Sequence, residues 1–282
     1  MRYALPESLV AQARAFASGD SEPAAPRNAA TVVLTRPGDA GPEVYLLRRQ
    51  ASMAFAAGFC VFPGGGVDDR DFEAHVDWAG PSVEQWAAQL DTDEATARAL
   101  VCAAVRETFE ESGVLLAGPS ADEVVSDTTD PDWEADRVAL EAREFSFSEF
   151  LQRRGLVLRS DLLVPWSAWL TPIFEPRRYR TWFFAAALPE GQRTRDVSSE
   201  SSSVTWMGAE EVVAQVESRA MMMLPPTYLT CLQVAQFASP SDLVVGARDR
   251  HVQMFMPEVI ADGEEFVLSR PDWALELLDA RA

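Results

Sequence analysis

The chain contains no lysine. Of its 282 residues 24 are basic, all of them arginine, and 44 are acidic, so the formal net charge is 24 − 44 = −20. The absence of lysine excludes a Schiff-base lysine, a phosphate loop that ends in Gly-Lys-Ser or Gly-Lys-Thr, and a kinase-type ion pair. The negative charge argues against nucleic acids and anionic membranes as partners, because both attract basic surfaces.

Cysteine and histidine are also scarce. The three cysteines, Cys60, Cys102 and Cys231, are far apart, which predicts buried thiols in a reducing cytoplasm and not disulfides or a zinc site. The two histidines form no metal-binding pattern, so any metal is expected to be hard and held by oxygen. The longest uncharged stretch, residues 220–241, contains two adjacent prolines and several polar residues, which makes it unsuitable as a membrane span.

The N-terminal residues include charges and form no apolar signal core, so we expect a cytoplasmic protein. Hydrophobic residues make up 48% of the chain, which is enough to fill the core of a globular protein. Helical periodicity is predicted over residues 6–17, 83–90, 94–112, 133–143, 146–154, 209–220 and 226–238. Strands are predicted over residues 30–35, 44–49, 59–62, 114–117, 161–170, 179–188, 203–207, 252–256 and 265–268. This interleaving predicts an α/β or α+β sandwich.

The helix predicted over residues 94–112 carries the most informative pattern. Glu107, Glu110 and Glu111 follow the spacing i, i+3 and i+4, so they share one face of the helix. Like charges at this spacing oppose the helix unless a cation neutralises them, and three carboxylates suit Mg²⁺ or Mn²⁺. Arg106 can pair with Glu110 or orient Glu107. The alternative is an ordinary solvent-exposed acidic face.

Residues 106–114, Arg-Glu-Thr-Phe-Glu-Glu-Ser-Gly-Val, resemble the second half of the Nudix box, whose signature is Arg-Glu-U-x-Glu-Glu-x-Gly-U with U aliphatic. Phe62-Pro63-Gly64-Gly65 resembles the strand and glycine turn that open the box. Gly65 and Arg106 are 41 positions apart, against about 14 in an uninterrupted box, which indicates an insertion of about 27 residues. The first glutamate of the box, expected eight positions before Arg106, falls on Arg98 and counts as missing.

The inserted segment is similar to that of the coenzyme A diphosphatase-like subgroup of Nudix hydrolases. Leu46, Arg49 and Gly58 keep the spacing of the coenzyme A motif in that subgroup, although other positions of the motif differ. The resemblance implies a Nudix-type α/β/α sandwich with a mixed sheet, plus an insertion and a C-terminal extension. The expected parts are an N-terminal helix and link (1–27), a Nudix domain (28–240, with the insertion at about 69–93) and the extension (241–282).

The resemblance also implies a function. It implies Mg²⁺-dependent or Mn²⁺-dependent hydrolysis of a diphosphate bond in a nucleoside diphosphate linked to another group, with coenzyme A or acyl-coenzyme A expected first. An ADP-ribose or dinucleotide pyrophosphatase is one alternative, and a catalytically weak nucleotide-binding sensor is another. The expected partner is a small nucleotide substrate, and a homodimer remains an open alternative to a monomer.

The same resemblance assigns roles to individual residues. The metal ligands would be Glu107, Glu110, Glu111 and the Gly65 carbonyl. The catalytic residues would be Arg106, Glu107 and Glu200, with either glutamate as general base, although Glu200 also suits a solvated serine-rich loop.

Arginines are the candidates for the phosphates of the substrate, with surface salt bridges as the alternative. The candidates are Arg48, Arg49, Arg178 and Arg180. Because Arg48 and Arg49 leave one strand on opposite faces, at most one of them can face the substrate, and Arg49 is favoured since it falls on the arginine of the motif.

Overall fold

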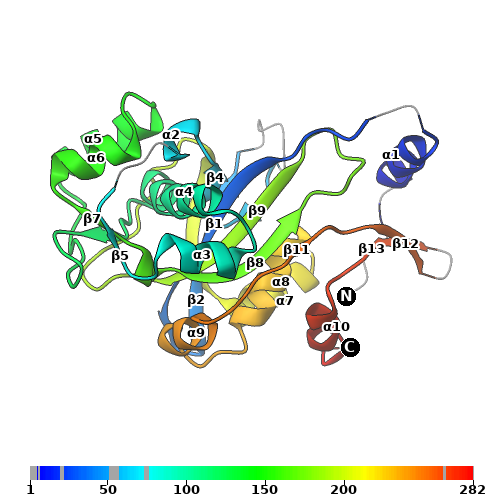
Figure 1. Ribbon diagram of the computed structural model, residues 1–282. Helices are drawn as coiled ribbons and strands as arrows, with labels where there is room; N and C mark the ends of the chain where they lie inside the picture. The colour runs from blue at the N-terminus through cyan, green and yellow to red at the C-terminus, as the bar shows by residue number, and fades with distance from the viewer. Residues whose placement is uncertain are drawn as a thin grey trace.

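The computed structural model describes residues 5, 7–19, 22–50, 57–72, 76–262 and 265–281. Its centre is an eight-stranded mixed sheet in the order β10-β2-β1-β9-β8-β11, with β3 paired to β2 and β4 paired to β1 (Figure 1). The strands of this sheet are β1 (Arg27–Gly38), β2 (Gly41–Arg49), β3 (Cys60–Val61), β4 (Gly64–Gly66), β8 (Val164–Leu170), β9 (Tyr179–Ala187), β10 (Ser201–Gly208) and β11 (Met254–Phe255). The β1–β9 and β8–β11 pairs are parallel and the other pairs are antiparallel.

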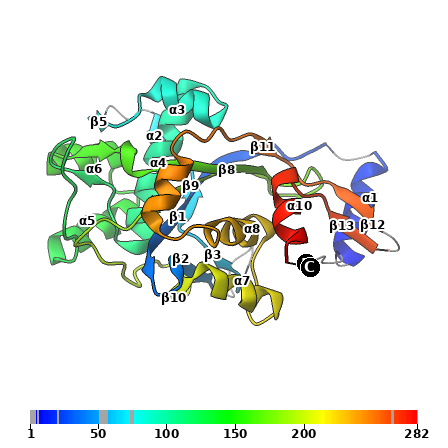
Figure 2. The same ribbon diagram turned by 90° about the horizontal axis from the view of Figure 1, so that it is seen from below.

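Helices cover both faces of the sheet, so the predicted α/β/α sandwich with a mixed sheet is confirmed (Figures 1 and 2). One face carries α2 (Asp69–Phe72), α3 (Val83–Leu90) and α4 (Glu94–Ser112), with α5 (Pro131–Glu141) and α6 (Phe147–Arg154) beside them. The other face carries α7 (Ala209–Glu217), α8 (Pro225–Val234) and α9 (Pro240–Ala247). Each face has its own hydrophobic core, because alternate residues of every strand point to opposite sides.

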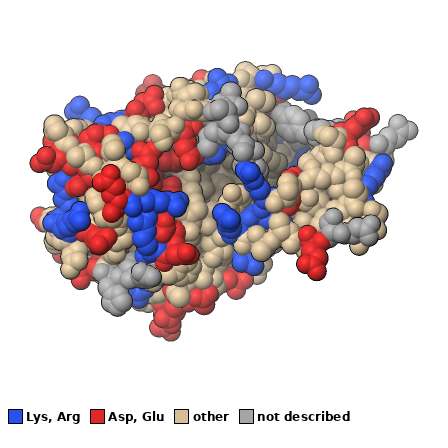
Figure 3. All heavy atoms as spheres, turned by 90° about the horizontal axis from the view of Figure 1, so that it is seen from above, with Lys and Arg blue, Asp and Glu red and all other residues tan. Residues whose placement is uncertain are grey.

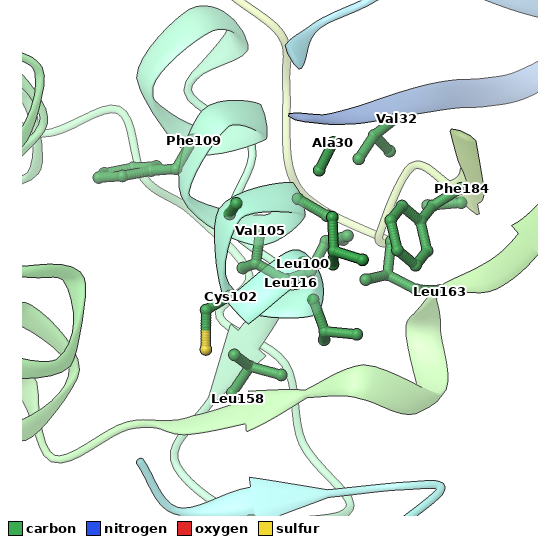
Figure 4. Packing of buried hydrophobic residues seen from close by; sticks show 14 of the residues in the cluster. Ala30, Val32, Leu100, Cys102, Val105, Phe109, Leu116, Leu158, Leu163 and Phe184 are labelled. Carbon is green, nitrogen blue, oxygen red and sulfur yellow. The ribbon is translucent and has the colours of Figure 1, made fainter. Parts of the chain in front are cut away.

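Helix α4 has the predicted bounds, because both of its ends carry local signals. The Asp93 side chain accepts a hydrogen bond from the Thr96 amide at 2.9 Å, which caps the N-terminus. Gly113 ends the helix in the left-handed region, at φ 75°, where glycine is favoured. The side chain of Leu100, on α4, lies between the helix backbone and Phe184 of β9 (Figure 4).

Phe109, near the C-terminal end of α4, packs on neighbouring helices and not on the sheet. Its ring points away from the sheet (Figure 4) and packs against Trp133 of α5 and Phe150 of α6, at centroid distances of 6.3 and 5.3 Å. The C-terminal end of α4 is therefore held between the sheet and a pair of helices.

The expected glycine turn is a short strand. Within β4, Gly64, Gly65 and Gly66 stand opposite Thr31, Ala30 and Ala29 of β1. Strand β1 pairs with β4 and also packs against α4. It therefore sets the position of the glycine backbone relative to the helix.

Several predicted strands differ from those observed. Of residues 114–117 only Ala117 is in a strand, β6 (Ala117–Gly118), which pairs with β7 (Val157–Arg159). The start of the strand predicted from residue 161 is instead a 3₁₀ turn, Ser160–Leu162. Conversely, β10 begins at Ser201, inside the predicted serine-rich loop, because it pairs with Arg49 of β2.

The insertion and the C-terminal extension are both built into the fold. In the insertion, β5 (Trp78–Ala79) joins β7 and β6 in a three-stranded sheet, and α3 packs on α4. In the extension, β11 joins the central sheet, and β12 (Val259–Asp262) pairs with β13 (Glu265–Leu268) before α10 (Asp272–Asp279). Helices α9 and α10 were not predicted. Helix α1 (Glu7–Ala17) lies beside the β12–β13 hairpin (Figure 2). The domain boundaries themselves stay a prediction.

The described helices include none whose length and apolar content would allow it to cross a bilayer. Cys60, Cys102 and Cys231 are free and buried, as expected.

Burial makes the native thiols unreactive. It raises the pKa of the Cys102 thiol to about 12, and the pKa of the Cys231 thiol is raised for the same reason. We therefore expect a disulfide thiol reagent at pH 8 to leave Cys102 and Cys231 unmodified in the native protein and to modify them in denaturant, where the thiol pKa returns to about 8.5. Mass spectrometry of the labelled protein checks this, and rapid labelling of either residue before unfolding would contradict the buried core.

Candidate functional site

The acidic face of α4 meets the glycine strand β4. The Gly64 amide donates a hydrogen bond to Glu111 Oε2 at 2.7 Å. Gly65 lies so close to Glu107 that a Cβ atom on Gly65 would stand 2.5 Å from Glu107 Oε2. A side chain at residue 65 would therefore displace the carboxylate, so the position requires glycine because of this close approach.

A single guanidinium connects the acidic groups. Arg106 lies 2.7 Å from Glu107, 3.0 Å from Asp71 and 3.3 Å from Glu110, measured between side-chain nitrogen and oxygen atoms. It also donates to the Gly66 carbonyl at 3.0 Å. Arg106 thus ties α2, β4 and α4 together. The predicted ion pair with Glu110 is present, and Arg106 also contacts Glu107, the residue that it was predicted to orient if it did not pair with Glu110.

Asp71 is a site residue that the sequence analysis missed. Eight positions before Arg106 stands Arg98, but that interval runs through the insertion. The glutamate of the box stands 14 − 8 = 6 positions after the glycine, so counting forward from Gly65 leads to residue 71, an aspartate. Its carboxylate is buried and binds Arg106. The glutamate of the box is therefore replaced by an aspartate and does not fall on Arg98, and the extra residues follow Asp71.

Burial disfavours the charged form of the glutamates on this face of α4. Asp71, Glu107, Glu110 and Glu111 form what we call the carboxylate cluster. Burial, reinforced by the charge of Glu107, raises the pKa of Glu110 to about 7 and that of Glu111 well above its usual range. Burial also raises the pKa of Glu107, although Arg106 opposes the shift. The cluster therefore has more acidic groups than Arg106 can neutralise.

These groups fit a divalent cation in their chemistry. Carboxylate and carbonyl oxygens are the ligands that Mg²⁺ and Mn²⁺ prefer, and a cation would offset the cost of burying the charges. Among the residues that the structure describes, no three acidic, histidine or cysteine side chains already converge as ligands of one ion. Glu107 and Glu110 are turned to Arg106, and Glu111 is turned to the Gly64 amide. Metal binding thus requires these side chains to exchange partners.

The structure brings Arg49 and Glu200 to the edge of the cluster. Glu200 lies in the turn before β10, with 58% of its side chain exposed, and it lies 3.7 Å from the Arg49 guanidinium. Glu200 lines the same cleft as Glu107, Glu110 and Glu111, which places it and its partner Arg49 beside the carboxylates. The charge of Glu200 helps to raise the pKa of Glu111, and that of Arg49 lowers it. Arg48, by contrast, is exposed, while its carbonyl accepts a hydrogen bond from Ser202. Of the two neighbouring arginines, Arg49 is the one near the cluster.

Helix α5 fixes the turn that carries Glu200. Arg137 donates to the Glu110 carbonyl at 2.8 Å and to Glu141 at 2.9 Å. Glu141 in turn accepts hydrogen bonds from the amide and hydroxyl of Ser199. This chain of contacts joins the end of α4 to the residue before Glu200. These contacts were not predicted from the sequence, although the i, i+4 spacing of Arg137 and Glu141 was a visible signal.

The two remaining candidate arginines are placed differently. Arg178 is buried, and its guanidinium donates to the carbonyls of Ala24 and Thr171, both at 3.1 Å. This geometry favours an anchoring role and does not bring Arg178 to the cluster. Arg180 is exposed on β9, in register with Asn28 of β1.

The cluster lines a cleft of about 260 Å³. Its rim includes Arg70, Arg143 and Glu200. Figure 3 shows acidic and basic side chains interspersed over the half of the molecule that carries α5 and α6, whereas the opposite half is mostly uncharged. A polar ligand at the cleft would therefore meet both signs of charge.

Known proteins include relatives of this chain. A family model described as the NUDT19 Nudix domain matches residues 83–233, which is more than half of the chain. Acyl-coenzyme A diphosphatase NUDT19 of Homo sapiens is 28% identical over 309 residues, covering 89% of this chain and 80% of that protein. The Xenopus laevis protein of the same name is 26% identical, covering 80% of this chain and 69% of its own.

The fold has a counterpart among solved structures. A Nudix hydrolase from Alicyclobacillus acidocaldarius is similar with a TM-score of 0.66 and 25% identity, and the match covers 78% of this chain and 96% of that one. The expected Nudix fold and the resemblance to the coenzyme A diphosphatase-like subgroup are therefore confirmed.

Replacement of Arg106 tests the central ion pairs. We expect Arg106→Gln to lower the free energy of unfolding by about 3 kcal/mol, because it leaves buried carboxylates without their cation. Arg143→Gln is the matched control: its side chain is 76% exposed and lies 3.8 Å from Asp68, so we expect a change within about 0.5 kcal/mol. Urea unfolding of the metal-free proteins measures both, and equal losses would show that Arg106 is no more than a surface charge.

Proposed function

The chain belongs to the NUDT19 Nudix domain family and is a Nudix hydrolase, and from this premise we propose that it hydrolyses the diphosphate bond of coenzyme A or an acyl-coenzyme A. The observation that carries the proposal is the buried acidic face of α4 against the glycine strand, with Arg49 paired to Glu200 at the edge of the same cleft. The names of the relatives support the choice of substrate. In the reaction, water adds to one phosphorus and the bridging oxygen leaves with the other, which yields two monophosphates.

Nudix hydrolases generally use divalent metal ions, and we propose Mg²⁺ or Mn²⁺ for this chain. Glu107, Glu110, Glu111 and the Gly65 carbonyl would hold it. When bound, such an ion neutralises phosphate charge and lowers the pKa of a bound water. The cation would compete with Arg106 for Glu107 and Glu110, because Arg106 pairs with both.

The other residues of the proposed site act on the substrate and on protons. Arg49 can donate two parallel hydrogen bonds to a phosphate, because its guanidinium is planar and lies beside the cluster. Glu107 and Glu200 are the candidates for general base. Exposure favours Glu200, since Glu107 is buried and bonded to Arg106. Ser199, held by Glu141, would fix the turn from which Glu200 acts.

A panel of substrates tests the proposed function. With Mg²⁺ or Mn²⁺ the protein should convert coenzyme A to 3′,5′-ADP and 4′-phosphopantetheine, as read by chromatography, and a chelator should stop the reaction. Glu110→Gln and Glu111→Gln should each lower kcat at least about a hundredfold. Glu94→Gln, at an exposed position of the same helix, should leave kcat within about twofold.

The panel also decides between the alternatives. Cleavage of ADP-ribose or a dinucleotide with coenzyme A untouched would assign the enzyme to those substrates. Inertness on every diphosphate with both metals, together with nucleotide binding, would identify a sensor.

A pair of glycine substitutions tests the geometry of the metal ligands. Gly65→Ala places a methyl group against the Glu107 carboxylate, so we expect kcat to fall about a hundredfold. Gly66→Ala is the matched control, because a Cβ atom there has nothing within 4 Å. Steady-state kinetics and thermal unfolding of both variants provide the comparison. Equal activity of the two variants would refute a role for the contact between Gly65 and Glu107.

A further inference from the structure

A second and larger hollow lies beside the cleft. It has a volume of about 750 Å³, and we call it the side cavity. It occupies the α7 and α8 face of the sheet, where Thr181 and Phe183 of β9 form its floor. Gly64 lines both the side cavity and the cleft, and Arg49 lines the side cavity while it pairs with Glu200 at the cleft. The two spaces therefore adjoin at Gly64, whose amide binds Glu111 of the carboxylate cluster.

The chemistry of the side cavity differs from that of the cleft. Most of its lining side chains are aliphatic, aromatic or thioether. They include Phe62, which follows β3, and three methionines of the link between α7 and α8, Met221, Met222 and Met223. Methionine side chains adapt to ligands of varied shape. The hydroxyl oxygen of Thr171, one of the polar lining residues, accepts a hydrogen bond from the backbone amide of Tyr179 at 3.1 Å. Such a lining suits a flexible alkyl chain, whereas a purine base would lose hydrogen bonds to water on entry.

Both ends of the described chain build the far wall. The side cavity is lined by Leu9 of α1, by Pro257 before β12 and by Leu268 of β13. The Leu5 amide donates to the Phe266 carbonyl at 2.8 Å, and the Arg14 guanidinium lies 4.8 Å from the Phe266 ring centre. These contacts hold α1 on the β12–β13 hairpin. The segments outside the predicted Nudix domain thus help to enclose a space that also borders Gly64 and Arg49.

We propose that the side cavity binds the acylated pantetheine arm of the substrate while the diphosphate lies at the carboxylate cluster. The proposal rests on the proposed function and deepens it, because it assigns acyl-chain selection to the α7–α8 link and to the two chain ends. The volume lies within the range of about 300–1,000 Å³ that is common for ligand pockets. The charged nucleotide end of the substrate would then lie at the cleft, beside Arg70 and Arg143.

A chain-length series tests the proposal. For acyl-coenzyme A substrates of increasing length, kcat/KM relative to coenzyme A should rise by up to about fourfold for each methylene that enters, until the side cavity is full. Thr181→Phe fills the floor with a larger side chain and should remove most of this rise. Thr129→Phe is the matched control, since Thr129 is exposed in the loop before α5, and it should leave the series unchanged.

A second variant covers the case in which Thr181→Phe fails to fold. Met222 is 50% exposed at the side cavity, so Met222→Glu should fold and should lower the preference for long chains through its charge. A flat chain-length series in the wild-type protein, or one that neither variant alters, would overturn the assignment. If coenzyme A is cleaved in that case, the proposed function still stands.

Calorimetry without metal separates the two proposals. Acyl-4′-phosphopantetheine, which has no diphosphate bond to cleave, should bind the metal-free protein with a negative heat-capacity change that grows with acyl length. Thr181→Phe or Met222→Glu should weaken this binding at least about tenfold. Binding without any turnover of the substrate panel would support the side cavity and refute the hydrolase proposal. No binding at any acyl length would refute the side cavity.

Discussion

The arrangement around α4 depends on the burial of several carboxylates beside one guanidinium. Arg106 contacts Asp71, Glu107 and Glu110 as well as the Gly66 carbonyl, so α2, α4 and β4 share one counter-charge. Desolvation penalises each buried carboxylate, and ion pairing offsets this only where the geometry is good. The positions of the three elements are therefore set by electrostatics as much as by the hydrophobic core beneath them.

The absence of lysine has a structural counterpart in the way the arginines are used. Arg106, Arg137 and Arg178 each donate to a backbone carbonyl and to further acceptors from other parts of the chain. A guanidinium offers five N–H donors in one rigid plane, whereas an ammonium group is a compact point charge. Residues that the sequence alone presents as phosphate ligands thus include Arg178, which serves to anchor the chain.

Local signals explain which parts of the fold could be predicted. The bounds of α3 and α4 follow from capping side chains and from Gly113, all within a few residues of the helix ends. The strand expected at 114–117 was wrong because most of that segment has no strand partner, which no local pattern reveals. In the site, the acidic face and Arg106 could be predicted from helical spacing. Asp71 could have been reached by counting forward from Gly65, and the spacing of Arg137 and Glu141 was visible as well. The bond from Arg137 to the Glu110 carbonyl could not be predicted, because the two residues lie far apart along the chain.

The insertion lengthens the loop between two contacting residues, and polymer physics says how much this matters. Asp71 and Arg106 are 35 positions apart, against eight in the uninterrupted pattern. Closure entropy grows only with the logarithm of loop length, so the longer loop costs about 1.3 kcal/mol. That is little more than one ordinary hydrogen bond contributes. Chain entropy thus allows segments of very different length to be accommodated after Asp71, provided that each returns the chain to the start of α4.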